Sequence, residues 1–388
     1  MPKIRPSVLA LGEWMFEIRR DIHRHPELGY EEKRTSGLVA RELRALGYDV
    51  KTGLGRTGVA GLRRFSPAGR VLGLRADMDA LPVVESPKNF CRSEIEGLMH
   101  ACGHDLHIAT LLGAARVLAR DEALGRSLRG AVKVIFQPAE EGGRGALAMI
   151  NDGVLQNPAL DAIFAAHVAP QLETGLIGYT PGVAMAAVDN FTIHFQGRGG
   201  HAAHPKYAQD PIAPAAEFVN RLKKAAAPLD RALLAICTFH AGTKSNIIPD
   251  QAVITGTLRA LSEPHHEKLL AILSKTVEDF AREKSLEVKL NLEKGYPMLV
   301  NDDRMLAVLK QAAGLAVGPA NVVEHAPSFG AEDMAYFLKE VPGVNYNLGC
   351  RKPGGPVTMI HSSEFDPNEE AMLVGVEVMI RLAEALLA

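Results

Sequence analysis

Val71-Leu-Gly-Leu-Arg-Ala-Asp-Met-Asp79 is the stretch from which we infer the fold of this 388-residue chain. Its first four residues form a short apolar run, typical of a buried strand, which leads directly into charged side chains. Two further runs, Ala131–Phe136 and Ala162–Ala166, lead into Gln137-Pro-Ala-Glu-Glu141 and into His167. In an α/β sheet, ligands bind beyond the carboxyl ends of the strands. We therefore expect acidic and imidazole groups to converge at one sheet edge.

Helical spacing of apolar residues surrounds these strands. It occurs in residues 11–24, 36–46, 108–118 and 304–317, and from Pro367 to the end of the chain. The alternation of helical and strand patterns predicts an α/β domain.

The pattern changes near Ala184. A strand from Val188 is followed by a helix at 211–224, strands at 233–239 and 252–259, a helix at 264–283 and a strand at 286–292. This β-α-β-β-α-β order matches the ferredoxin-like split βαβ sandwich. We therefore predict an α/β fold with a discontinuous metal-binding catalytic domain, residues 1–183 plus 297–388, and an inserted ferredoxin-like α+β domain, residues 184–296.

Composition narrows the classes of partner and compartment. The chain is 47% hydrophobic and 23% charged, with a net charge of -2. We therefore expect a small-molecule substrate, no nucleic acid and no membrane. The four cysteines (Cys91, Cys102, Cys237 and Cys350) show no disulfide framework, and no apolar run reaches the roughly 18 residues of a membrane span, so we expect a cytoplasmic protein.

A candidate metal loop, His100-Ala-Cys-Gly-His-Asp105, places a thiol and two imidazoles around a glycine. A buried cysteine beside a helix-starting histidine is the alternative interpretation of Cys102 and His104. Further metal-compatible groups lie at Glu140, Glu141, His167 and His361. Thiolate, imidazole and carboxylate together suit zinc or a neighbouring transition ion, and they are too many for one tetrahedral ion. Two ions would use them, and the glutamate that is not a ligand could move the proton of an activated water.

These motifs together resemble the M20 family of metallo-amidohydrolases and peptidases, in particular the branch with hippurate hydrolases, N-acyl-amino-acid amidohydrolases and auxin-conjugate hydrolases. The resemblance covers nearly the whole chain. It rests on residues 24–28, 75–82, 100–105, 137–141, 167–168, 199–202 and 246–250, and on His361 followed by Phe365. It implies a zinc-peptidase-like mixed sheet in the catalytic domain and an inserted domain that acts as a lid and dimerisation domain.

The resemblance also implies roles for single residues of the metal site. Two divalent ions per subunit, chosen from zinc, manganese, nickel and cobalt, would be held by Cys102, His104, Glu141, His167 and His361, with Cys102 as the bridging ligand. Glu140 is implied as general base and acid. Asp79 would orient a ligand or the catalytic group, although a turn cap is its alternative. Asp77 stands where related peptidases carry a metal-binding histidine, and we expect it to lie outside the ligand set.

Four further residues are implied in catalysis or substrate binding. His201 would reach the partner subunit's active site and donate to the oxyanion; the alternative is a loop histidine. Asn246 and Arg259 would bind the free carboxylate of the substrate, although Arg259 could be a solvated strand-end arginine. Gly330 is a further substrate-binding candidate, in a Gly-Ala-Glu-Asp loop where Ala331 replaces the serine of many relatives.

We therefore expect metal-dependent hydrolysis of N-acyl-L-amino acids, hippurate-like or N-acetylated, by a homodimer or dimer of dimers formed through the inserted domain. The alternatives are an M20 dipeptidase or carboxypeptidase, an N-acetyl-diaminopimelate-type deacetylase, and a non-catalytic binding protein. Residues 85–98 depart from the glycine-rich sequence of relatives, and we expect this segment to affect specificity. We expect His23, His25 and His240 to be structural.

Overall fold

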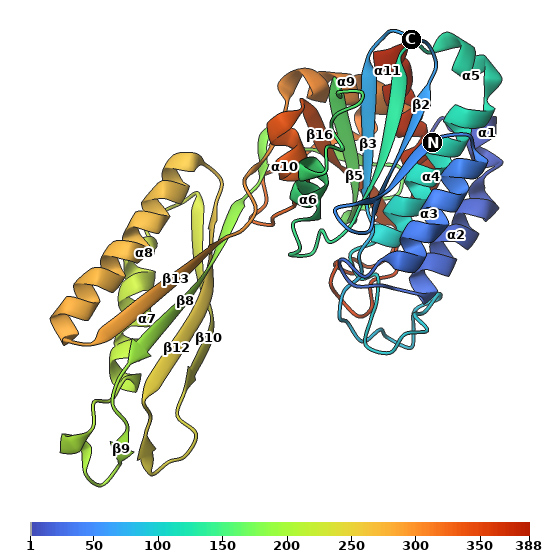
Figure 1. Cartoon of the computed structure of the whole chain (residues 1–388). Coiled ribbons are helices and arrows are strands. Elements are labelled where there is room, and N and C mark those ends of the chain that lie inside the picture. Colours follow the sequence, from blue (N-terminus) through green and yellow to red (C-terminus); the bar gives the residue numbers. More distant parts are fainter. Residues whose placement is uncertain (1) are drawn as a thin grey trace. The chain divides into compact units, whose positions relative to one another are not determined.

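A computed structural model describes residues 2–388 and divides the chain into two compact units (Figure 1). Unit 1 comprises the residues up to Gly182, Val300–Ala326 and Asp333–Ala388, and unit 2 comprises Val183–Leu299 and Pro327–Glu332. The short segment 327–332 was predicted to lie in the catalytic domain. It belongs to unit 2 because the Ala186 N–H donates to the carbonyl oxygens of Ser328 and Gly330, at 3.1 and 2.9 Å.

Unit 1 is built on an eight-stranded mixed sheet in the order β1-β2-β4-β3-β5-β16-β6-β15. The four central strands, β4, β3, β5 and β16, are parallel to one another. The bounds are β1 Asp49–Leu54, β2 Gly58–Arg64, β3 Val71–Asp77, β4 Ala131–Gln137, β5 Ala162–Glu173, β6 Ile177–Tyr179, β15 Val322–Glu324 and β16 Gly343–Arg351. Every residue of β3 and β4 is buried, as continuous apolar runs predict for strands covered on both faces.

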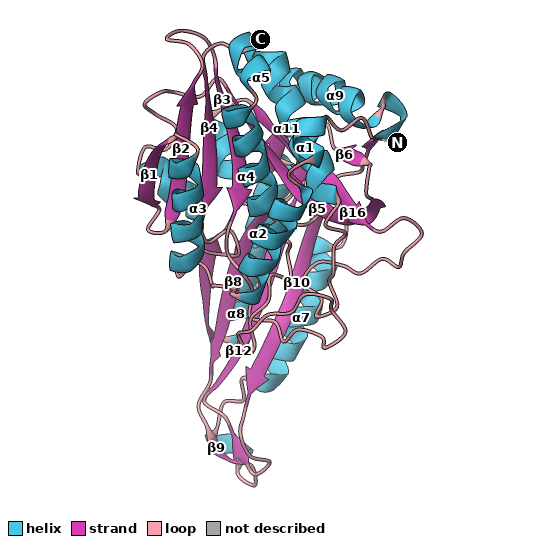
Figure 2. Cartoon of the chain, turned by 90° about the vertical axis from the view of Figure 1, so that its right-hand side faces the viewer, coloured by secondary structure: helices cyan, strands magenta, loops and turns pink. Residues whose placement is uncertain are grey.

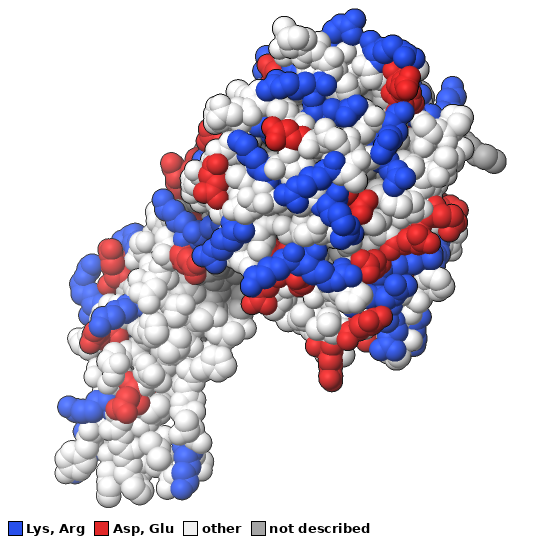
Figure 3. Space-filling view, turned by 45° about the vertical axis from the view of Figure 1, so that its right-hand side comes forward, with Lys and Arg blue, Asp and Glu red and all other residues white. Residues whose placement is uncertain are grey.

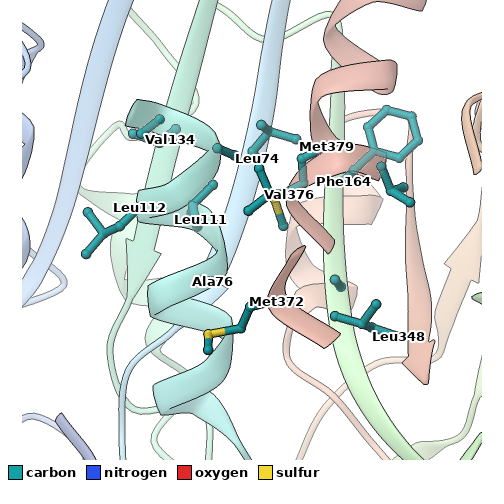
Figure 4. Packing of buried hydrophobic residues seen from close by; sticks show 14 of the residues in the cluster. Leu74, Ala76, Leu111, Leu112, Val134, Phe164, Leu348, Met372, Val376 and Met379 are labelled. Atoms are coloured by element: carbon teal, nitrogen blue, oxygen red, sulfur yellow. The ribbon is translucent and has the colours of Figure 1, made fainter. Parts of the chain in front are cut away.

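Helices cover this sheet and form its core. The longer ones are α2 Gly12–Arg24, α3 Lys33–Ala45, α4 His104–Arg120, α9 Asp303–Val317 and α11 Ala371–Leu387, and the shorter ones are α1 Pro6–Leu9, α5 Glu122–Ser127, α6 Gly145–Asn151 and α10 Met334–Glu340. Figure 4 shows side chains of α4 and α11, among them Leu111 and Val376, beside Leu74 and Phe164 of the strands. Because α4 is buried along nearly its whole length, the polar side chains near its start are held in a dry environment.

The sequence pattern missed parts of this sheet. Strands β1, β2, β6, β15 and β16 were not predicted, and the predicted end of β5 at Ala166 was wrong, since the strand continues to Glu173. β5 pairs with β3 only as far as Ala165, and β16 supports the remainder by pairing through His167 and beyond. His167 therefore lies within a strand rather than after it.

Unit 2 has the predicted β-α-β-β-α-β order, in an antiparallel sheet of order β10-β12-β8-β13. Its elements are β8 Ala187–Gln196, α7 Ile212–Ala226, β10 Ala232–Ala241, β12 Gln251–Ala260, α8 Glu263–Lys284 and β13 Glu287–Lys294 (Figure 2). Phe195, Phe218 of α7 and Phe280 of α8 meet edge to face, with ring centroids 5.3 to 6.2 Å apart. These three rings fix both helices on one face of the sheet.

Short elements complete the two units: β7 Gly182–Met185, β9 Gly200–His201, β11 Ile247–Ile248, β14 Leu299–Asn301, and the 3-10 turns η1 Pro205–Tyr207 and η2 Pro319–Asn321. On the face shown in Figure 3, Lys and Arg side chains are spread over the surface, with fewer Asp and Glu side chains between them. Within residues 2–388, no helix has the length and apolar character needed to cross a membrane.

Candidate metal centre

The ends of three parallel strands bring the predicted site residues to one edge of the unit 1 sheet. β3 is followed by Asp79, and β4 is followed by Glu140 and Glu141. His167 lies two residues beyond the last pairing of β5 with β3. Since β3 and β4 run parallel to each other and β3 runs parallel to β5, these side chains reach the same edge, as the sequence predicted.

Two groups of potential ligand atoms share the Cys102 thiol. Cys102, His104 and His167 form the first, and Cys102, Glu141 and His361 form the second; within each group the ligand atoms lie within 4.8 Å of one another. The structure thus brings together all five side chains that were predicted as ligands. A third group joins His104 with Glu140 and Glu141 within the same limit. A thiol common to both groups is compatible with the predicted bridging role of Cys102, which stays a prediction.

The tautomer of His167 follows from its hydrogen bond. Its Nδ1 lies 2.8 Å from the carbonyl oxygen of Val168, which only accepts, so Nδ1 carries the proton. The unprotonated Nε2 faces the Cys102 Sγ at 3.5 Å. Metal-binding histidines usually donate their other N–H to a carbonyl or a carboxylate in this way. Burial raises the pKa of the Cys102 thiol, but the neighbouring His167 and His104 outweigh it and lower that pKa to about 7.

Two buried histidines, His104 and His107, lie one turn apart on α4, and they differ in the hydrogen bonds of their ring nitrogens. His107 Nδ1 donates to Asp77 at 2.6 Å and its Nε2 accepts the Val168 N–H at 2.9 Å, while burial lowers its pKa to about 4. Among the described residues, neither ring nitrogen of His104 has a hydrogen-bond partner; Asp79 Oδ1 lies 3.3 Å from Nδ1 without hydrogen-bonding geometry. Among the described residues, a fully buried imidazole with no hydrogen-bond partner fits a metal ligand, whereas both ring nitrogens of His107 are already hydrogen-bonded.

His361 completes the second triad from a loop. Its φ of +64° is in the left-handed region, and its N–H donates to the Ala101 carbonyl oxygen at 2.7 Å. Its Nε2 lies 3.1 Å from Glu141 Oε1. Hydrogen bonds to Cys102 and Glu141 raise the pKa of His361 to about 10, and the same ion pair holds the pKa of Glu141 below its usual value despite burial.

Asp79 fixes the turn that carries the two glutamates. Its Oδ1 accepts the Glu140 N–H at 3.0 Å, and its Oδ2 accepts the Glu141 N–H at 2.9 Å. The two roles weighed for Asp79, turn cap and orienting acid, are therefore compatible. The side chain of Glu140 is buried, and its Oε1 accepts the Asp333 N–H at 3.3 Å.

A buried charge network beneath the site was missed by sequence reasoning. Arg75 donates to Gln137 Oε1 at 2.8 Å, to Asp77 Oδ2 at 2.6 Å and to Asp333 Oδ1 at 3.1 Å. Gln137 also donates to both oxygens of Asp333, at 2.7 and 2.8 Å. The signal was present, since Arg75 and Gln137 are polar residues in buried strands, but their partner Asp333 is far away in the sequence.

The unusual segment 85–98 contacts the loop that carries His361. The Ser86 N–H donates to the Ser363 carbonyl oxygen at 2.9 Å, and the Asn89 side chain donates to the same oxygen at 3.2 Å. Glu85 lies 3.0 Å from Nε2 of the buried His23. The segment therefore supports a candidate metal ligand, and its effect on specificity stays a prediction.

The predicted substrate-binding residues fall into two pairs within unit 2. His201 in β9 and Asn246 are neighbours, since the Ala202 N–H donates to the Asn246 carbonyl oxygen at 3.1 Å. Arg259 donates to the carbonyl oxygen of Phe329, the residue before Gly330, at 2.7 Å. Strand β12 separates the pairs, and its eight residue steps from Gln251 to Arg259 span about 26 Å. Asn246 and Arg259 of one chain therefore cannot bind the same carboxylate.

The fold and the cluster of thiol, imidazole and carboxylate groups indicate an α/β protein with a candidate metal site, and the comparisons specify its family. Residues 73–385 match peptidase family M20/M25/M40. Thermostable carboxypeptidase 1 of Saccharolobus solfataricus is 38% identical over 396 aligned residues, which cover 100% of this chain and 97% of that protein. IAA-amino acid hydrolase ILR1-like 4 of Arabidopsis thaliana is 37% identical over 96% of this chain and 85% of its own length.

A solved structure agrees with these relatives. The crystal structure of the Bacillus subtilis YXEP protein, described as a dinuclear metal binding peptidase from the M20 family, superposes with a TM-score of 0.82 and 31% identity, covering 97% of this chain and 98% of that chain. The chain belongs to peptidase family M20/M25/M40 and is a hydrolase of amide or peptide bonds, which confirms the predicted family and enzyme class.

Proposed function

We propose that this enzyme hydrolyses the amide bond of N-acyl-L-amino acids, with N-benzoyl and N-acetyl derivatives as first candidates. The observation that carries the proposal is the pair of triads sharing Cys102 beside the buried carboxylate of Glu140. Two divalent ions, of zinc, manganese, nickel or cobalt, would be held by Cys102, His104, Glu141, His167 and His361. When bound, they supply polarisation of the amide carbonyl and activation of a water molecule.

Glu140 is proposed to move the proton. Its carboxylate takes a proton from the attacking water and passes it to the nitrogen of the leaving amino acid. Asp79 holds the Glu140 backbone, and the Asp333 N–H holds its Oε1, so the carboxylate is fixed before substrate binds. Fixed positioning of this kind is what proton transfer within hydrogen-bond reach requires.

Residues of unit 2 are proposed to hold the substrate. Arg259 would contact the free carboxylate at two points, Asn246 would bind it by its amide with Gly330 nearby, and His201 would donate to the carbonyl oxygen as negative charge develops there. Because Asn246 precedes the start of β12 and Arg259 lies near its other end, their joint use favours a dimer through unit 2 in which His201 and Asn246 of the partner subunit complete each site.

A carboxypeptidase is the second candidate, because the name of the Saccharolobus solfataricus relative specifies that activity. The Arabidopsis thaliana relative is named for an amino acid conjugate, which favours the first. A dipeptide and an N-acyl amino acid differ in the free α-amino group. Kinetics on matched N-benzoyl, N-acetyl and dipeptide substrates of one amino acid would separate the two.

Glu140→Gln tests the mechanism. The metal-reconstituted variant is expected to lose activity on N-acyl amino acids by roughly 10²- to 10⁴-fold, the range for loss of a general acid–base group, while it retains both metal ions. Metal content is measured by atomic emission on the same samples. Hydrolysis at near the wild-type rate would refute the assigned role.

Mixed dimers test whether a site is shared. Glu140→Gln and His201→Ala are each expected to be nearly inactive alone. Random assortment of the two chains restores about a quarter of wild-type activity, because half of the dimers carry one site with both residues intact. A mixture that stays as inactive as its components, with exchange verified by mass spectrometry, would contradict the partner's His201 as a contributor.

A further inference from the structure

Unit 1 contains a cavity of about 300 Å³ that borders Glu141 and Asp79. Its walls come from residues 28–30, 79–82 and 139–143, so it is built by the two turns that follow β3 and β4 together with a segment near the amino terminus. An engineered cavity of about 150 Å³ binds benzene, and small-molecule sites begin near 300 Å³. The cavity therefore has room for a single aromatic ring beside a candidate metal ligand.

The walls are mostly apolar. Leu28, Tyr30, Leu81, Pro82 and Ala139 line the cavity together with three glycines. The hydroxyl of Tyr30 donates to the carbonyl oxygen of Gly143 at 2.6 Å, so this polar group is already satisfied. Gly143 has no room for a side chain, since a Cβ there would come within 2.6 Å of the Ala139 Cβ.

The charged side chains that line the cavity are both acids, Asp79 and Glu141. No Lys or Arg belongs to the lining among the described residues; Arg56 stacks 4.4 Å over the Tyr30 ring without lining the space. Such a cavity would repel the carboxylate of an amino acid. It would accept an uncharged apolar group.

We propose that this cavity receives the acyl group of the substrate, with aromatic and branched aliphatic acyl groups preferred over acetyl. The inference rests on the proposed function, which supplies a substrate with one negative end and one uncharged end. The candidate carboxylate-binding residues, Asn246 and Arg259, belong to unit 2. The acidic, apolar cavity of unit 1 is therefore assigned to the uncharged end.

Two filling variants and one enlarging variant test the assignment. Leu81→Trp and Leu28→Trp each replace a leucine side chain by a larger indole ring that fills the cavity, and Leu81→Ala removes part of the cavity wall. Leu315→Trp is the matched control, because Leu315 is 54% exposed on α9 and does not line the cavity. The quantity compared is kcat/KM for N-benzoyl-L-alanine relative to N-acetyl-L-alanine.

Both filling variants are expected to lower this benzoyl-to-acetyl ratio by at least about tenfold, the discrimination that an apolar pocket gives for a small change in size. Leu81→Ala is expected to raise kcat/KM for N-naphthoyl-L-alanine, which has a larger acyl group, relative to N-benzoyl-L-alanine. In the filling variants, kcat/KM for N-acetyl-L-phenylalanine relative to N-acetyl-L-alanine should stay within about twofold of the wild-type ratio. In Leu315→Trp, both this ratio and the benzoyl-to-acetyl ratio should stay within about twofold of wild type. A filled cavity that changes the phenylalanine-to-alanine ratio instead would overturn the assignment and place the amino acid side chain there.

A binding measurement separates this inference from the proposed function. In the Glu140→Gln background, the calorimetric Kd for N-benzoyl-L-alanine is expected to weaken at least about tenfold with Leu81→Trp and to stay unchanged with Leu315→Trp. Equal affinities in all three proteins would refute the acyl site. Absence of hydrolysis by the wild type would contradict the proposed function alone, since the calorimetric comparison still reports whether the cavity binds the benzoyl group.

Discussion

Asn89→Ala is expected to weaken the binding of one of the two proposed metal ions. Asn89 is 9% exposed, and its Nδ2 donates to the carbonyl oxygens of Ser363 and Phe365 at 3.2 and 3.4 Å and to Glu85 Oε1 at 2.9 Å. These carbonyls flank the turn that follows His361. A buried acceptor left without its donor costs about 1–3 kcal/mol.

This cost falls on the loop that presents His361. If the loop must be ordered before His361 can bind, a cost of about 1–3 kcal/mol corresponds to roughly 5- to 150-fold in affinity. Residues that hold metal ligands in place commonly contribute about 10- to 100-fold. We therefore expect the ion whose site includes His361 to bind about 10- to 100-fold more weakly, and the ion held by the Cys102, His104 and His167 triad to be unaffected.

Calorimetric titration of the metal-free protein with Zn²⁺, monitored together with thermal unfolding, measures both sites. Lys88→Ala is the control. Lys88 contacts the same loop through Glu364 at 3.0 Å, but both side chains are exposed. Surface pairs of this kind contribute at most about 1 kcal/mol. Wild-type affinity at both sites in Asn89→Ala, or equal weakening of both ions, would refute the reasoning.

Three further predictions concern stability. Glu85→Gln should destabilise the protein by about 1–3 kcal/mol below the unfolded histidine pKa of about 6.5, and by less as the pH rises through the folded pKa of His23. Burial and Arg19 lower the pKa of His23, but Asp105 and Glu85 outweigh them and raise it, so the contribution is complete below the unfolded pKa and is lost above the folded one. Urea unfolding across the pH range checks this, and a loss that does not change with pH would count against it. Asp79→Asn, which turns an amide N–H toward backbone N–H donors, should cost about 1–3 kcal/mol and reduce activity, and an unchanged urea midpoint would contradict this. Phe164→Ala, at a side chain with no exposed surface, should cost about 3–5 kcal/mol in the same assay, and a cost below 1 kcal/mol would be inconsistent with the packed core.

The sequence predicts an element well where one physical rule dominates its environment. β3 and β4 are covered on both faces and therefore read as continuous apolar runs, and β12 alternates between buried and more exposed residues. β1 follows neither pattern: none of its residues is buried, and it reads Asp-Val-Lys-Thr-Gly-Leu. It is a strand because β2 pairs with it, a contact that local sequence does not encode.

The same limit applies to the site. Residue type and spacing were enough to predict Cys102 and His104 as candidate ligands, because both lie in one short motif. The difference between His104 and His107 depends on Asp77 and on the Val168 N–H, which reach α4 from two different strands. Pairings of this kind become visible only when the register of β3 and β5 is known.

The distribution of buried charge supports the proposal that this site binds divalent cations. Arg75 is engaged by Asp77 and Asp333, and Arg19 by Asp105, so the permanent cations of this region are already paired one layer away from the ligands. Cys102 and Glu141, by contrast, lie next to imidazoles: His167 Nε2 is 3.5 Å from Cys102 Sγ, and His361 Nε2 is 3.1 Å from Glu141 Oε1. Neutral imidazole cannot offset a buried thiolate and a buried carboxylate, and protonated imidazole cannot be a ligand. Divalent ions would resolve both problems together, because they would neutralise the anions and leave the imidazoles unprotonated. The buried arginines thus neutralise the acids beneath the site and help unit 1 to stay folded. They leave the negative charge of the candidate ligands available to metal ions.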